Sequence, residues 1–237
     1  MIKVYCKKGN EAKNISVQVG EEQAGIFYAY IALDFEEATS PSECRFAFTV
    51  PCVDVYSSWS PSGGMKRYVA PNWSKHSQRS RLALGAPVMS MISKSGMNRG
   101  TVALSDANTS CYIGCGVIEE NAELEYELRF FTELTAPLEH YEVTVRVDLR
   151  DIPFYESLKQ TERWWREDIG FGEAYAPDSA KMPMDSLWYS FHQLLDPEKI
   201  LEECRISKSL GMDTVIIDDG WQTDDNNRGY DVRKIPT

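Results

Sequence analysis

The sequence predicts a mainly β protein: an N-terminal antiparallel β-sandwich, then a linker helix, then a β-α-β segment of the kind that begins an α/β barrel. From residue 2 to about residue 150, apolar and polar residues mostly alternate with a period of two, as in half-buried strands. At Asp151 the apolar period becomes helical. After Pro183, strand-like and helix-like segments alternate. The predicted domains are therefore 1–150 for the sandwich, 151–182 for the helix with its connector, and 183–237 for the β-α-β segment.

The strands predicted within 1–150 are short and are separated by Gly, Asn, Pro and Asp residues, which is typical of antiparallel sandwiches. They are expected at 2–5, 15–19, 25–33, 44–50, 88–92, 100–104, 111–118, 124–131 and 141–149. Residues 57–81 show no clear period and carry Trp59, Trp73 and several arginines. A long irregular loop is expected there, and loops of that length in compact domains are often functional.

A single amphipathic helix is expected next. Asp151 is suited to capping it, Pro153 suits its first turn, and Gly170 is a natural end. The apolar stripe at Phe154, Leu158, Trp165 and Ile169 indicates packing against a core. Residues 172–182 are expected to form an irregular connector.

The last segment combines two predicted strands with a helix between them. Residues 187–191 are expected to form a short apolar strand, and Asp196 and Pro197 to open a helix that ends at Gly211. Residues 214–217 form a β-branched run, as in buried parallel strands. This run leads directly into Asp218-Asp219-Gly220-Trp221. Polar residues at that end of a parallel strand lie on the ligand-binding rim of an α/β barrel.

Composition excludes several functional classes. Asp and Glu number 36 against 25 Lys and Arg, a net charge of −11, which argues against nucleic-acid partners and anionic membrane surfaces. The six cysteines lack zinc-site spacing and His numbers only 3, so no metal, no cofactor and a reducing, cytoplasmic location are expected. Asp224 and Asp225 add to the acidic cluster around Asp218, but the spacing is not that of an EF-hand.

Residues 183–221 resemble the start of the catalytic barrel of glycoside hydrolase family 36, the α-galactosidases and the related raffinose and stachyose synthases. The resemblance rests on Ser186-Leu187-Trp188-Tyr189-Ser190-Phe191, on the helix ending Ser209-Leu210-Gly211-Met212, and on Val215-Ile216-Ile217-Asp218-Asp219-Gly220-Trp221-Gln222. Family members place a β-sandwich before the barrel, in agreement with the pattern of residues 1–150. The resemblance thus implies that residues 183–237 begin a (β/α)8 barrel that is incomplete in this chain.

The resemblance also implies roles for individual residues. Asp218 and Asp219 would accept hydrogen bonds from the O4 and O6 side of galactose, and Trp188 would form a wall of the same pocket. Trp221 is a further possible binding residue. The expected ligand is a small neutral carbohydrate, a terminal α-galactoside.

The family's two catalytic aspartates lie on later barrel strands, and neither sequence context is found here. Residues 183–237 number 55, whereas a complete barrel needs about 250. The parent activity is therefore expected to be retaining hydrolysis of α-galactosides, with this chain alone inactive. Two alternatives stay open: a galactosyltransferase of the raffinose-synthase type, and a non-catalytic carbohydrate-binding or oligomerisation module that uses residues 59–81. Assembly into homo-oligomers is compatible with all three.

Overall fold

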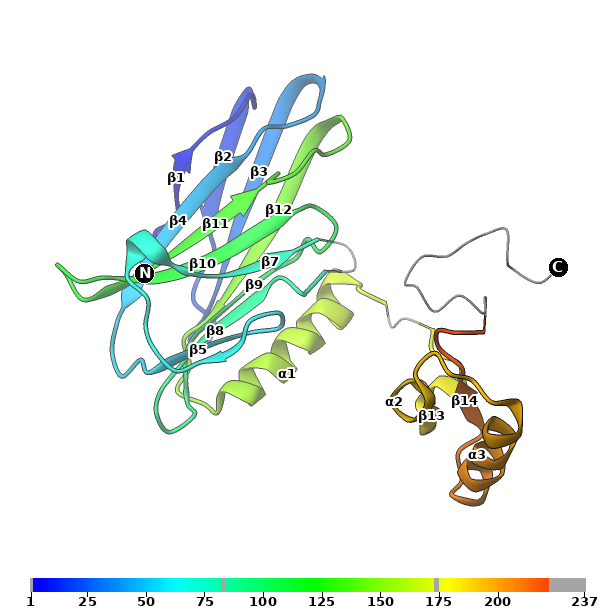
Figure 1. The fold of residues 1–237 in the computed structure, drawn as a ribbon. Coiled ribbons are helices and arrows are strands. Elements are labelled where there is room, and N and C mark those ends of the chain that lie inside the picture. Colours follow the sequence, from blue (N-terminus) through cyan, green and yellow to red (C-terminus); the bar gives the residue numbers. More distant parts are fainter. Residues whose placement is uncertain (1, 82–83, 173–174, 222–237) are drawn as a thin grey trace. The chain divides into compact units, whose positions relative to one another are not determined.

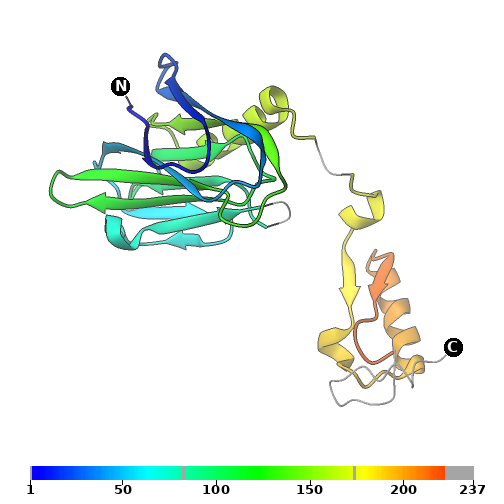
Figure 2. The same cartoon turned by 90° about the horizontal axis from the view of Figure 1, so that it is seen from above.

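The computed structural model describes residues 2–81, 84–172 and 175–221. Contacts between residues divide the chain into two compact units, Met1–Gly172 and Glu173–Thr237. The first unit contains two antiparallel sheets and a helix, and the second contains a parallel strand pair with helices (Figures 1 and 2). The predicted mainly β class is confirmed, and the domain limits at 150 and 182 stay a prediction.

The first unit holds a five-stranded and a seven-stranded sheet (Figure 1). The five-stranded sheet has the order β1 (Tyr5–Lys8), β4 (Cys44–Pro51), β11 (Glu123–Phe130), β10 (Cys111–Ile118) and β7 (His76–Ser80). The seven-stranded sheet has the order β2 (Asn14–Val19), β3 (Ile26–Thr39), β12 (Leu138–Asp148), β9 (Asn98–Leu104), β8 (Val88–Ile92), β5 (Ser57–Ser60) and β6 (Gly64–Lys66).

Side chains from both sheets form one hydrophobic core, to which β4, β10 and β11 of one sheet and β3 and β12 of the other contribute every second residue. Phe48 of β4 stacks on Tyr126 of β11 with ring centroids 5.1 Å apart, and both rings are fully buried. The Tyr126 hydroxyl donates a hydrogen bond to the Gly100 carbonyl oxygen of β9, 3.0 Å away in the other sheet. This bond satisfies a buried polar group and fixes the two sheets at one point of their shared core.

The prediction of a loop at residues 57–81 is wrong, because β5, β6 and β7 lie there, with a short 3₁₀ turn η1 (Asn72–Ser74) between β6 and β7. The inward positions of these strands are polar, which hides the period of two. Ser58 and His76 are both buried, with the Ser58 hydroxyl 2.5 Å from His76 Nδ1. Buried Gln78 donates to the Ala86 carbonyl oxygen at 3.1 Å. The strand predicted at 2–5 is also displaced, since β1 begins at Tyr5.

Helix α1 (Phe154–Trp164) continues as a π-helical turn, η2 (Trp165–Ile169), and ends at Gly170, where φ is +82°, as predicted. The Asp151 cap is wrong: Pro153 is the cap residue and makes no side-chain cap bond. Asp151 instead accepts a hydrogen bond from Arg99 Nη1 at 2.6 Å. Three of the four residues of the predicted apolar stripe, Leu158, Trp165 and Ile169, pack against the cluster around buried Trp164, and Phe154 does not belong to that cluster.

A buried polar network joins the other face of α1 to the end of β12. The carboxylate of Asp148 is fully buried and accepts hydrogen bonds from Ser157 Oγ at 2.7 Å and from Arg150 Nε at 2.8 Å. Buried Arg146 donates to Thr161 Oγ1 at 3.1 Å and to Asp148 at 3.4 Å. Burial acts to raise the pKa of Asp148, but the hydrogen bonds from Arg150 and Ser157 and the charge of Arg146 outweigh it and lower that pKa.

The second unit is a β-α-β arrangement preceded by a 3₁₀ turn, η3 (Asp178–Lys181). Strands β13 (Met184–Ser186) and β14 (Thr214–Ile216) pair in parallel, with α2 (Trp188–Phe191) and α3 (Pro197–Ser209) between them. The strand predicted at residues 187–191 is wrong: the strand precedes it, and Trp188 begins a helical turn. The apolar residue that suggested a strand, Leu187, is instead buried where the turn begins.

The predicted helix boundaries in this unit are confirmed. The Asp196 side chain accepts from the backbone N–H groups of Glu198 and Lys199, so it caps α3 as expected. Gly211 has φ +85°, and Met212 N–H donates to the Ser207 carbonyl oxygen at 3.0 Å, which closes the end of the helix. Ser207 Oγ also donates to Asp185 of β13 at 2.6 Å and thereby holds α3 against the strand.

We expect Asp148→Asn to destabilise the first unit by about 3 kcal/mol, because Arg146 then stays buried beside a neutral partner. Urea unfolding followed by circular dichroism measures this, with Asp151→Asn, at an exposed carboxylate, as the matched control. Because the pKa of Asp148 is lowered on folding, its contribution is complete above its unfolded value of about 4 and disappears as pH falls through the folded value. The free energies of unfolding of the parent chain and of Asp148→Asn should therefore become equal in acid. A difference between these free energies that stays constant down to strongly acidic pH would contradict this role.

Candidate functional site

The residues predicted to bind galactose follow the carboxyl ends of two neighbouring parallel strands. Ser186 of β13 pairs with Ile216 of β14, and Leu187 N–H still donates to the Ile216 carbonyl oxygen at 3.1 Å. Trp188 lies two residues after the end of β13, and Asp218 lies two residues after the end of β14. Parallel strands end at the same edge of a sheet, so these segments leave the sheet on the same side.

Trp188 is half-buried and held by a ring contact. It is the first residue of α2, and its indole stacks on the His192 imidazole with centroids 4.2 Å apart and planes at 28°. Because α2 spans one turn, the two rings lie on the same side of it. Trp188 therefore has a fixed orientation but lies in a helical turn and not in the strand that the sequence suggested.

The turn after β14 packs on the segment that follows α2. Gly220 has φ +102°, and a Cβ atom there would lie 2.6 Å from the Gln193 carbonyl oxygen. Only glycine permits so close an approach of two backbones. The contact brings Asp219, which is half-buried, next to the segment that follows Trp188 and His192. Asp218 is exposed, and Trp221 is 66% exposed.

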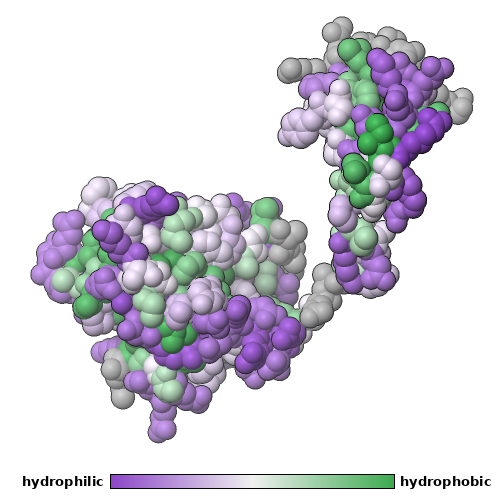
Figure 3. Space-filling model, turned by 90° about the horizontal axis from the view of Figure 1, so that it is seen from below, coloured by the Kyte–Doolittle hydropathy of each residue, from purple (hydrophilic) through white to green (hydrophobic). Residues whose placement is uncertain are grey.

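Several large apolar side chains lie at the surface of this unit. They belong to the η3–β13 region, to α3 and to β14, and Figure 3 shows apolar residues gathered on one face of it. They are Met182, Met184, Leu201, Ile206, Leu210, Ile216 and Ile217, each at least 40% exposed. Apolar surface of this extent is typical of a face that packs against other protein.

The first unit carries a second candidate site on the outer face of the five-stranded sheet. Glu125 and Glu127 of β11 are buried, although they point away from the core. Lys7 Nζ lies 2.7 Å from Glu125 and 3.3 Å from Glu127, and Lys75 Nζ lies 2.8 Å from Glu125. Burial acts to raise the pKa of Glu125, but the two lysines outweigh it and lower that pKa, so the group is ionised at neutral pH.

A cavity of about 150 Å³ lies beside these carboxylates. It is lined by Asn72, Trp73, Lys75, Ser77, Tyr112, Gly114, Glu127 and Arg129. Four of these lie within the segment 59–81 that the sequence marked for binding or assembly. The others, including Tyr112 and Glu127, were missed, because alternation in β10 and β11 indicates which residues face outward but not which of them meet a distant turn. Trp59, from the same segment, packs instead against the core cluster of Trp164.

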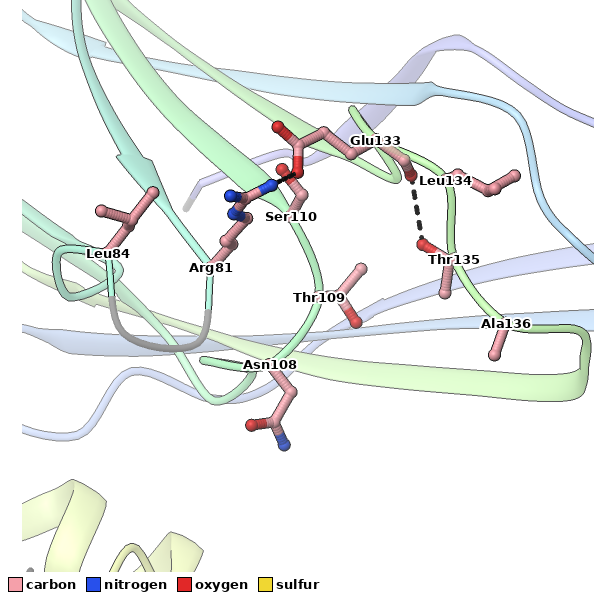
Figure 4. Close-up of a pocket in the computed structure, with 9 residues that line it drawn as sticks. All are labelled: Arg81, Leu84, Asn108, Thr109, Ser110, Glu133, Leu134, Thr135 and Ala136. Carbon is pink, nitrogen blue, oxygen red and sulfur yellow. Dashed lines mark hydrogen bonds and ion pairs between the residues drawn. The ribbon is translucent and has the colours of Figure 1, made fainter. Parts of the chain in front are cut away.

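A larger cavity of about 540 Å³ lies at one end of the same sheet (Figure 4). Arg81 and Glu133 meet across it in an ion pair, and the loop containing Leu134, Thr135 and Ala136 forms one side. Its described lining residues include no aromatic ring. The pairing of Arg81 with Glu133 neutralises the charges that would attract a ligand, so this cavity is a weaker candidate than the one beside Trp73.

Comparison with models of known protein families gives no match, and comparison with curated proteins gives none either. Across residues 2–81, 84–172 and 175–221, no helix is long and apolar enough to cross a bilayer. Within the same residues, no group of three or more His, Cys, Asp or Glu side chains could hold a metal ion.

We expect Gly220→Ala to displace the turn that carries Asp219, because the new Cβ would overlap the Gln193 backbone. Amide chemical shifts of residues 191–194 should change throughout, as measured by NMR. Gly211→Ala is the matched control: its φ of +85° is equally unfavourable for alanine, but no atom lies within 4 Å of the new Cβ. Unchanged shifts at Gln193 in Gly220→Ala would contradict the packing of these two segments.

Proposed function

We propose that this chain is part of a retaining glycoside hydrolase related to the α-galactosidases of family 36, and that it supplies half of the galactose-binding pocket. In this proposal, the two antiparallel sheets are the β-sandwich that precedes the catalytic domain. The β13-α3-β14 arrangement is then the start of a (β/α)8 barrel.

The observation that carries the proposal is the parallel pairing of β13 with β14 across α3. Trp188 and the Asp218-Asp219 pair then follow the carboxyl ends of adjacent strands, where α/β barrels bind their ligands. The contact of Gly220 with Gln193 adds support, because it draws the two segments together. The exposed apolar side chains of α3 and β14 are in keeping with burial by further barrel elements.

The chemistry of the pair suits a galactoside. Two carboxylates offer four oxygens that accept hydrogen bonds from sugar hydroxyls, and such charge-assisted bonds are strong. Galactose has an axial 4-hydroxyl where glucose has an equatorial one. A carboxylate positioned for the axial group would be left without its hydrogen bond by glucose, so the site would select against it. Trp188 would supply the apolar surface on which the sugar ring packs.

Hydrolysis with retention needs two further carboxyl groups about 5–5.5 Å apart, one as nucleophile and one as acid and base. By the resemblance, both belong to later barrel strands. The proposed part of Asp218, Asp219 and Trp188 is therefore to bind and orient the sugar.

We expect D-galactose to bind the chain weakly, with a Kd of about 1–10 mM, and D-glucose to bind more weakly still. Asp218→Ala should raise the Kd for galactose at least about tenfold, because it removes charge-assisted bonds. Asp213→Ala, which replaces an exposed carboxylate just before β14, is the matched control and should bind like the parent chain. Titration followed by the amide shifts of residues 216–221 makes the measurement. Equal binding by both variants would exclude Asp218 from the site.

We also expect the purified 237-residue chain to leave an aryl α-galactoside uncleaved, because binding without a nucleophile and a proton donor does not break the glycosidic bond. Release of the aryl alcohol, measured by absorbance, tests this. Release at a rate that falls in Asp218→Ala would show that the catalytic carboxyl groups lie within these residues.

A further inference from the structure

The cavity beside Trp73 lies on the outer face of the five-stranded sheet, in the first unit, and does not rest on the proposed function of the second. Its floor is Gly114 of β10, with Glu127 of β11 and Ser77 of β7 on either side of it. The Lys75 side chain passes close to this floor, since a Cβ atom on Gly114 would lie 3.2 Å from Lys75 Cδ. The absence of a side chain at Gly114 therefore makes room for Lys75, which passes over the strand beside the cavity.

Trp73 stands at the edge of this hollow and is 83% exposed. It is carried by the η1 turn, which is fastened to β10 by the bond from Val117 N–H to the Ala70 carbonyl oxygen, 2.8 Å long. The turn lies so close to the strand that a Cβ atom on Gly116 would be 2.5 Å from the Pro71 carbonyl oxygen. A large apolar ring is thus held in water by a fixed backbone, and covering it would release unfavourable hydration.

A second aromatic residue of the cavity is held by a neighbouring cation. Tyr112 of β10 lines the cavity, and the Arg79 guanidinium lies over its ring, 5.8 Å from the centroid. Arg79 in turn forms an ion pair with Glu133. Two aromatic residues therefore border the cavity from different elements: Trp73 on a turn whose backbone is bonded to β10, and Tyr112 beneath the Arg79 guanidinium.

The polar lining favours a neutral ligand rich in hydroxyl groups. Glu127 accepts from Arg129 Nε at 2.7 Å and from Lys7 Nζ at 3.3 Å. Burial acts to raise the pKa of Glu127, but Arg129, Lys75 and Lys7 outweigh it and lower that pKa, so the group is an ionised acceptor at neutral pH. Both lining cations are already paired, Lys75 with Glu125 and Arg129 with Glu127, which leaves little attraction for an anion.

We infer that this cavity binds a single neutral pyranose ring of a saccharide. The ring stacks on Trp73, its hydroxyl groups donate to the Glu127 carboxylate, and Ser77 and Asn72 complete the polar contacts. The volume of about 150 Å³ equals that of about five water molecules, which suits one sugar ring rather than a longer segment. The fixed turn and the fixed carboxylate reduce the entropy lost on binding.

The test is an NMR titration of the full chain with methyl glycosides of galactose, glucose and mannose up to about 50 mM, well above the millimolar Kd expected for one ring. The readout is the indole Nε1–H resonance of Trp73, assigned by its loss in Trp73→Phe. We expect a saturable shift of this resonance with at least one glycoside. Because the Trp73 side chain is exposed, Trp73→Ala should fold normally and weaken binding at least about tenfold, read from the amide shifts of Gly114 and Ser77.

Three further variants define the site. Trp73→Phe should keep part of the affinity for the glycoside. Glu127→Gln, which keeps the shape of the side chain but removes its charge, should lower that affinity. Tyr155→Ala, at an exposed aromatic residue on α1, is the control and should bind normally. Binding here should be unaffected by Asp218→Ala, so failure of this site and failure of the proposed galactose site are seen separately. A Trp73 resonance that does not move with any glycoside, or equal affinity in Trp73→Ala, would overturn the inference.

Discussion

The first unit depends on one buried carboxylate, that of Asp148 at the end of β12. It accepts a hydrogen bond from Ser157, and its neighbour Arg146 donates to Thr161, and these two bonds join the end of β12 to helix α1. A buried charge is tolerated only when it is paired and hydrogen-bonded, so the network requires α1 to present Ser157 and Thr161 at this one position. The apolar side chains around Trp164 pack the helix against the sheet, but such hydrophobic contacts are not directional. The polar network therefore fixes where along the sheet the helix lies.

The period of two made most of this unit predictable from its sequence. The strands at Val88–Ile92 and Cys111–Ile118 have the predicted limits, because apolar residues that face the core recur at every second position: Met89 and Met91 in the first, Cys111, Ile113 and Cys115 in the second. The same reasoning failed at β5 and β7, where Ser58, His76 and Gln78 occupy inward positions and bond to one another or to the backbone. Such pairs form between segments far apart in the chain, and a single sequence does not reveal them.

The two candidate sites differ in how far a sequence can predict them. The grouping of Trp188 with Asp218 and Asp219 follows from local signals: a β-branched run, a capped helix and the rule that parallel strands end at one edge. The strand predicted at Leu187–Phe191 was wrong, because a short apolar run fits a helical turn equally well, and here only Leu187, just before the turn, is buried. The cavity beside Trp73 joins a turn, β7, β10 and β11, and its carboxylate, Glu127, reads in the sequence as an ordinary outward residue of a strand.

Both candidate sites contain glycines at which the absence of a Cβ atom permits close packing. Gly116 lets the η1 turn rest on β10, which places Trp73, and Gly114 makes room for the Lys75 side chain beside the cavity. Gly220 lets the turn after β14 meet the Gln193 backbone, which places Asp219. At Gly116 and Gly220 two backbones approach more closely than a Cβ atom permits, and the contact positions the neighbouring candidate residue, Trp73 or Asp219. Polar and aromatic groups would supply the chemistry of the two proposed sites, and close backbone packing at Gly116 and Gly220 helps to decide where those groups lie.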